Sequence, residues 1–227
     1  MGSNPTGPAK IKNRQSMTSI FASADFTIFS TLIIFILSFG LALLISKKYR
    51  AKKQEPYLYW SIGIWLFALG VFLEVLFAVG VTYQLLIIAY LFTVSLIVNF
   101  LAFGSVKLIK GKIYGRAYAI YSIATEAILA YFLAATRIGN IIINHIVYGI
   151  LPLNVVTASS LVTFPAAILL IAIAIKSYAK GKSKKMLSII IGVIIVSIAG
   201  TLYIVQVPAF LYYSEFVGIL LLWYGLI

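Results

Sequence analysis

Seven long runs of apolar residues restrict the possible folds of this chain more than any other feature. Each run is about 20 residues long, the length that a helix needs to cross the hydrocarbon core of a bilayer. Inside lipid every backbone amide must be paired within its own segment, and this requirement selects helix. We therefore predict an all-α polytopic membrane protein, a bundle of seven transmembrane helices at about residues 26–46, 57–79, 85–106, 117–136, 153–175, 186–205 and 208–226.

The small share of charged residues supports lipid as the main solvent of the chain. Of the 227 residues 63% are hydrophobic and 10% are charged, whereas a soluble domain usually carries about 25% charged residues. The formal charge of +13 is compatible with nucleic-acid binding. The cations, however, lie in short clusters between the apolar runs, which is typical of cytoplasmic loops. We therefore predict a multi-pass protein of the cell membrane with no nucleic-acid partner.

The distribution of these cations predicts the orientation of the bundle. The odd-numbered loops hold 14 of the 18 Lys and Arg residues, and the even-numbered loops hold Arg137 alone. Odd loops should thus be cytoplasmic, with the N-terminus outside and the C-terminus inside; Lys10, Lys12 and Arg14 argue weakly for the reverse. Basic cytoplasmic loops could also bind a protein partner or anionic lipid.

The sequence also allows predictions for two segments outside the apolar runs. Residues 1–25 are polar and rich in Gly and Pro near their start, which predicts a disordered tail or an added leader ahead of a natural start at Met17. The transmembrane domain then covers residues 26–227. The loop from Arg137 to Pro152 contains several Ile residues, and we expect it to lie as a short helix at the membrane interface.

Three of the five carboxylates of the chain fall inside apolar runs: Glu74, Glu126 and Glu215. A carboxylate in hydrocarbon costs at least ~2.5 kcal/mol, so each should face the bundle interior or water. All three fall in the central-to-outer half of their runs, and they could line one cavity that opens to the outside. The competing interpretation is that each is a protonated packing residue, hydrogen-bonded across a helix pair.

Helical spacing places small or hydroxyl-bearing residues on the same face as each acid. Small residues allow close helix approach, and hydroxyls supply partners for a buried acid. Asn99 is a further polar residue within a run, either a hydrogen-bonding residue between helices or a ligand contact. The candidate ligand or ion pathway is Glu74, Glu126, Glu215, Asn99, Tyr212 and Ser122.

Pro165 interrupts the fifth run and is a candidate gate. Proline removes one backbone hydrogen bond and should kink the helix, while nearby hydroxyls can satisfy the freed carbonyl. A static bend is the commoner consequence of such a residue.

Missing residue types argue against catalysis. His145 is the single histidine and there is no cysteine, which disfavours a metal centre and leaves no Ser–His pair for nucleophilic catalysis. We expect no enzyme activity, no metal and no cofactor.

The seventh run, PAFLYYSEFVGILLLWYGL, contains no lysine for a Schiff base. The chain therefore differs from retinal-binding rhodopsins, and we expect no retinal. The segment LYWSIGIWLFALGVFLE, Leu58 to Glu74, resembles the second helix of uncharacterised prokaryotic seven-helix proteins and of seven-helix sensor modules. The Ile-, Tyr- and Lys-rich composition is similar to that of thermophilic archaeal proteins.

Two functions fit these features. The first is a receptor-like, sensor or accessory membrane protein that acts through partners or a small ligand, as the basic loops and the resemblance imply. The alternative is a proton- or cation-coupled transporter or channel, because carboxylates on separate helices are what such a pathway needs.

Overall fold

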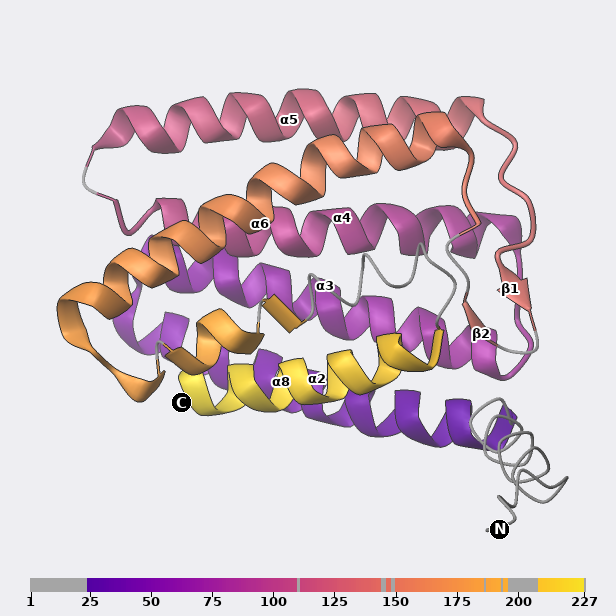
Figure 1. Cartoon of the computed structure of the whole chain (residues 1–227), viewed down its shortest axis with the longest axis horizontal. Helices are drawn as coiled ribbons and strands as arrows, with labels where there is room; N and C mark the ends of the chain where they lie inside the picture. The colour runs from indigo at the N-terminus through magenta and orange to yellow at the C-terminus, as the bar shows by residue number, and fades with distance from the viewer. Residues whose placement is uncertain are drawn as a thin grey trace, which may run out of the picture.

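The computed structural model describes residues 24–109, 111–143, 146–147, 150–185, 187–192, 194–195 and 208–226. Long helices dominate this part of the chain and run along the longest axis of the molecule, mostly antiparallel to their neighbours in sequence (Figure 1). The helices with defined bounds are α2 (Ala24–Lys52), α3 (Glu55–Ala78), α4 (Gln84–Val106), α5 (Lys112–Ala135), α6 (Leu153–Gly181) and α8 (Pro208–Leu226).

The predicted all-α class is confirmed, and the first five predicted spans correspond to α2 to α6. Each of these five helices is long and apolar enough to cross a membrane. The seventh predicted span corresponds to α8, whose part Leu211–Leu226 is a shorter apolar helix. The sixth, at 186–205, lies largely outside the described residues, although 187–192 and 194–195 are helical. The predicted tail also lies almost entirely outside them.

Large apolar side chains cover the outside of the bundle. Ile120 and Ile123 on α5 are 71% and 72% exposed, and Phe29, Ile36 and Ile168 are also exposed. A soluble monomer rarely presents so much contiguous apolar surface. Length, composition and this outer surface are together consistent with an integral membrane protein.

Contacts between small residues and bulky neighbours bring α3 close to α4. The site of a Cβ at Gly63 lies 3.0 Å from the Leu101 side chain, and Gly70 faces Ile97. The absence of side chains at these two positions lets the helix axes approach each other. In the rest of the bundle, α2 packs on α3 and α8, and α4 packs on α5 and α6.

The loop between α5 and α6 forms a two-stranded ribbon, and the predicted interfacial helix is wrong. Strands β1 (Ile142–Ile143) and β2 (Ile146–Val147) pair antiparallel, with Ile142 opposite Val147. β-Branched side chains favour strands, and the segment is too short for a stable helix. The ribbon turns its apolar side chains toward the bundle, where Ile146 and Val147 are buried.

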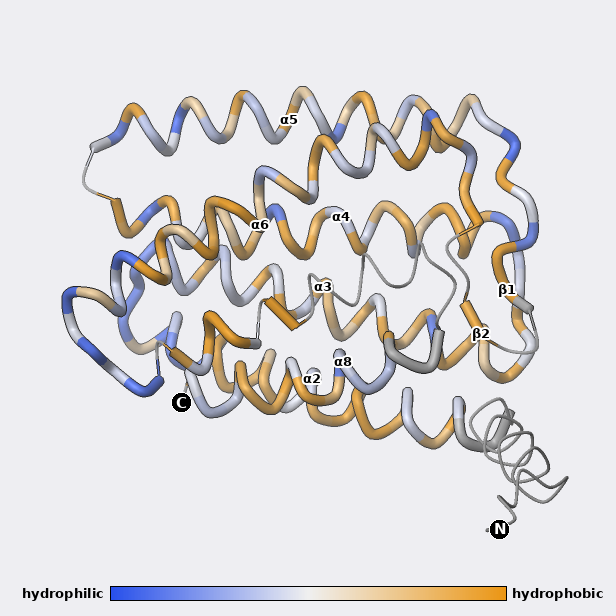
Figure 2. The backbone as a smooth tube through the Cα atoms, viewed as in Figure 1, coloured by the Kyte–Doolittle hydropathy of each residue, from blue (hydrophilic) through white to orange (hydrophobic). Residues whose placement is uncertain are grey.

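Most of the strongly hydrophilic segments gather at one end of the bundle. The ends of α2 and α6 and the connection from α4 to α5 lie together at this end, which is on the left in Figure 2. Lys48 Nζ donates a hydrogen bond to the carbonyl of Leu226, so the end of α8 also lies here. The ribbon and the start of α8 lie at the opposite end (Figure 1).

The described part of the sixth predicted span runs antiparallel to α8. Ser188 Oγ donates to the carbonyl of Leu221 at 2.8 Å. Gly225 lies against Ile189 and Lys185, whereas Gly192 lies against Leu221. Residues closer to 192 therefore contact residues closer to the start of α8, as expected for an antiparallel pair.

Candidate functional site

Two buried carboxyl groups meet between α3 and α8. Glu74 is 2% exposed and Glu215 is 8% exposed. Their carboxyl groups lie close enough to interact directly with each other. Glu74 Oε2 and Glu215 Oε2 are buried and have no N–H or O–H donor among the described residues. We call these two residues the acid pair.

A tyrosine from a third helix completes the environment of Glu74. Tyr90 Oη on α4 donates to Glu74 Oε1 at 2.6 Å, and the ring of Tyr90 packs edge-on against Phe77. One oxygen of Glu74 is thus held by a hydroxyl. Since an ionised carboxylate can only accept hydrogen bonds, a hydrogen bond between Glu74 and Glu215 would need a proton on one of the two acids.

The depth of the two acids within their helices explains why they meet. Glu74 lies four residues before Ala78, the last residue of α3, and Glu215 lies seven residues after Pro208, the first residue of α8. Both distances are measured from the ribbon end of the bundle, and they correspond to ~6 and ~10 Å along a helix. The similar depths of the two acids therefore agree with a direct contact.

Tyr212 lies one turn before Glu215 on α8. Its side chain is buried and belongs to an apolar cluster that includes Ile34 of α2, Ile64 of α3 and Ile146 of the ribbon. Both acids are buried, and Tyr212 beside Glu215 connects them to this apolar cluster.

Glu126 belongs to a separate polar network between α4 and α5. Ser95 Oγ donates to Glu126 Oε2 at 3.0 Å, and Asn99 Nδ2 donates to Glu126 Oε1 at 3.1 Å. Asn99 Oδ1 accepts from Tyr118 Oη at 2.9 Å and from Ser122 Oγ at 2.7 Å. Both oxygens of Glu126 therefore have donors, and Asn99 links three side chains of α5. We call these five residues the Asn99 network.

The acid pair and the Asn99 network occupy opposite sides of α4. Tyr90 and Asn99 are nine residues apart, which corresponds to about 180° around a helix at 100° per residue. Tyr90 contacts Glu74 on α3, whereas Asn99 contacts Glu126 on α5. Of the three glutamates predicted to line one cavity, the structure brings Glu74 and Glu215 together and places Glu126 elsewhere.

The two polar groups differ in what they can do chemically. The Asn99 network satisfies its carboxylate with fixed donors from Ser95 and Asn99, which suits a structural link between two helices. The acid pair has two oxygens without such donors, and a proton shared between the two acids would relieve the repulsion between them. A group of this kind can bind and release a proton, or hold a cation, when its surroundings change.

Pro165 lies inside α6, which continues through it from Leu153 to Gly181. Proline has no N–H, so the carbonyl of Leu161 four residues earlier loses its partner within the helix. Tyr121 Oη on α5 donates to this carbonyl at 2.5 Å. The freed group is thus satisfied by a neighbouring helix rather than by a hydroxyl of α6. In Figure 1, α6 crosses α4 obliquely.

The sequence does not predict Tyr90 as the hydrogen-bond partner of Glu74, or Tyr121 as the partner of the Leu161 carbonyl. The short turn between α3 and α4 gives a partial signal for Tyr90, because residues at similar distances from such a turn lie at similar depths in the two helices. Glu74 is four residues before Ala78, where α3 ends, and Tyr90 is six residues after Gln84, where α4 begins. Tyr121 offers no such signal, since its partner is a backbone carbonyl 40 residues away.

Comparison of the chain with protein-family models, with curated proteins and with solved structures finds no match.

Proposed function

We propose that this chain is a proton-coupled membrane transporter in which the acid pair is the proton-binding site. The observation that carries the proposal is the contact of Glu74 with Glu215 in an apolar interior. Two acids in such contact hold one proton well, because two adjacent buried negative charges repel each other strongly.

The position of the pair suits a coupling role. Glu74 and Glu215 come from α3 and α8, so the shared proton links two helices that are far apart in the sequence. Loss of the proton would leave two carboxylates in contact and favour separation of these helices. Binding or release of the proton would thereby change how α3 and α8 pack. A link between proton binding and conformation is what a proton-coupled transporter requires.

The receptor-like or accessory role expected from the sequence relies on the basic end of the bundle. That feature is common to cytoplasmic loops in general. The acid pair is the more specific feature, since carboxylates within a membrane span are costly and tend to serve proton or ion pathways. We place the protein in the cell membrane with its basic end toward the cytoplasm.

Chemical labelling tests the shared proton directly. A hydrophobic carbodiimide reacts with protonated carboxyl groups in apolar surroundings. We expect Glu74 or Glu215 to be labelled in the membrane-embedded protein, with less labelling as the pH rises. Peptide mass spectrometry identifies the labelled residue, and Glu55, which is exposed, serves as the internal comparison.

Proteoliposomes test the function. We expect a pH gradient to drive proton uptake, reported by an enclosed pH-sensitive dye, at a rate above that of protein-free vesicles. Glu74→Gln and Glu215→Gln should each reduce this uptake at least tenfold. Glu126→Gln is the matched control, because the same change is made to an acid that already has fixed donors. Uptake equal to protein-free vesicles, or uptake retained by the Glu74→Gln/Glu215→Gln double variant, rejects the proposal.

A further inference from the structure

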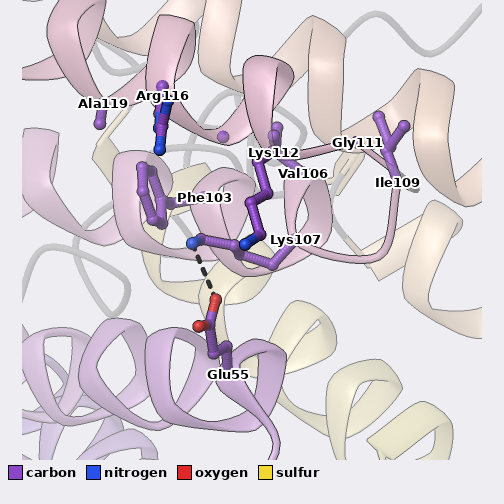
Figure 3. Close-up of a pocket in the computed structure, with 10 residues that line it drawn as sticks. Glu55, Phe103, Val106, Lys107, Ile109, Gly111, Lys112, Arg116 and Ala119 are labelled. Atoms are coloured by element: carbon purple, nitrogen blue, oxygen red, sulfur yellow. Dashed lines mark ion pairs between the residues drawn. The ribbon is translucent and has the colours of Figure 1, made fainter.

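A pocket of about 440 Å³ lies at the basic end of the bundle, away from the acid pair. Its walls come from the start of α3, the end of α4 and the start of α5 (Figure 3). The α4 wall is apolar, with Phe103 and Val106, and Ile109 follows it in the connection to α5. The pocket thus combines an apolar wall with the charged groups at its rim.

The charges around the pocket do not balance. Lys107, Lys112 and Arg116 line it, against Glu55 as the one lining carboxylate. Lys107 Nζ lies 2.7 Å from Glu55 Oε2, and this contact raises the pKa of Lys107, so the side chain keeps its charge. Lys112 and Arg116 have no carboxylate partner within the described part of the chain. Two positive charges therefore remain available to an anion.

The backbone adds further donors at the same place. Helix α5 begins at Lys112, and its N-cap residue Gly111 supplies no side-chain hydrogen bond to the first turn. The first N–H groups of a helix lack partners within it and carry the positive end of the helix dipole. Gly111 and Gly115 both line the pocket, and neither has a side chain to cover these donors.

We propose that this pocket binds a phosphate group, and that the group belongs to the headgroup of an anionic phospholipid. Unbalanced cations and a helix start suit a phosphate. The apolar wall and the location at the end of the bundle suit the glycerol and acyl portions, as basic pockets between membrane helices do. This proposal does not depend on the proton site, since it involves none of its residues.

The test uses the full chain purified in a neutral detergent. Short-chain phosphatidylglycerol is titrated against the protein, with phosphatidylcholine and glycerol phosphate as parallel ligands, and binding is followed by native mass spectrometry. We expect phosphatidylglycerol to bind at least tenfold more tightly than either comparison ligand. Equal binding of glycerol phosphate overturns the lipid assignment. Equal binding of phosphatidylcholine, whose headgroup carries a phosphate but no net charge, overturns the assignment to an anionic headgroup.

Charge variants locate the binding. Lys112→Gln/Arg116→Gln should weaken phosphatidylglycerol binding at least fivefold. Lys176→Gln/Lys180→Gln is the matched control, because it removes two exposed cations from the end of α6 at the same end of the bundle but outside the pocket. An equal loss in both double variants would show unspecific attraction to a basic surface and reject the site.

Two further variants separate the pocket from a general loss of folding. Glu55→Gln removes the lining carboxylate and should tighten binding about threefold, which a damaged protein would not show. Gly115→Leu should abolish binding, because a Cβ at this position lies 3.6 Å from Lys107 Cε and the longer side chain fills the pocket. Weaker binding by Glu55→Gln, or unchanged binding by Gly115→Leu, contradicts the proposal.

Discussion

Among single residues, Glu126 gives the clearest test of how a carboxylate is accommodated inside this bundle. Glu126→Gln should change the free energy of unfolding by less than ~0.5 kcal/mol, because glutamine can keep both contacts. Its amide oxygen accepts from Asn99, and its amide nitrogen donates to Ser95 Oγ, whose single hydrogen is then free for the carbonyl of Phe92. Unfolding in sodium dodecyl sulfate measures the difference.

Glu126→Leu is the companion variant, and we expect it to lower the free energy of unfolding by about 1–3 kcal/mol. Leucine leaves Asn99 Nδ2 buried without its acceptor, while the hydroxyls of Tyr118 and Ser122 still hold Asn99 Oδ1. Equal stability of the Leu and Gln variants would show that the Asn99 network does not stabilise the fold.

Helical spacing in the sequence predicts which side chains of α5 take part in this network. Tyr118, Ser122 and Glu126 recur every four residues, and all three contact Asn99. The contact of Glu215 with Glu74 rather than with Glu126 could not be predicted in this way. Hydropathy and spacing show which face of a helix is polar, but the choice of neighbouring helix depends on the packing of the whole bundle.

For whole helices, the link between α5 and α6 at Pro165 is a specific expectation. Tyr121→Phe should lower the free energy of unfolding by about 1 kcal/mol, because the Leu161 carbonyl loses its donor. In a Pro165→Ala background the same change should cost clearly less, since the introduced alanine restores a backbone N–H to that carbonyl. A double-mutant cycle measures this coupling, and additive effects would contradict the assignment.

The approach of α3 to α4 at Gly104 provides a second test at this scale. A Cβ at Gly104 would lie 2.5 Å from Trp60 Cδ1. Gly104→Ala should therefore cost about 1–3 kcal/mol of unfolding free energy through overpacking. Gly139→Ala makes the same change where no atom lies within 4 Å, and it should be close to neutral. Similar unfolding curves for the two variants would reject close packing at Gly104.

The ribbon illustrates where prediction from sequence fails for an element. Apolar clusters at 141–143 and 146–147 favour a short helix at the membrane interface when only the sequence is considered. The same residues satisfy a strand, because short apolar runs do not distinguish the two periods. Burial of Ile141, Ile142 and Val147 against α3, α4 and α6 side chains decides the outcome, and this contact is between segments distant in sequence. Long runs such as α4 are less ambiguous, since lipid permits only helix there.

Across the whole molecule, the described helices alternate in direction, and their basic ends coincide. Lys48 of α2 contacts Leu226 of α8, so the chain ends at the basic end, whereas α2 begins at the opposite end (Figure 1). The end of α6 and the start of α8 lie at opposite ends of the bundle (Figure 1). An odd number of crossings is what the predicted seven spans require, and the positive-inside rule then predicts which end is cytoplasmic.

Cysteine labelling tests this orientation without background, because the chain has no cysteine of its own. We expect a membrane-impermeant maleimide to label Gly139→Cys in intact cells. Lys182→Cys should be labelled only after permeabilisation, because it lies at the opposite, basic end in the loop that follows α6. Gly139 has open space around it, so a cysteine there should not disturb folding. The reverse pattern would place the basic end outside, and the phosphate pocket would then face the outer leaflet, whereas the acid pair would lie in the cytoplasmic half of the membrane.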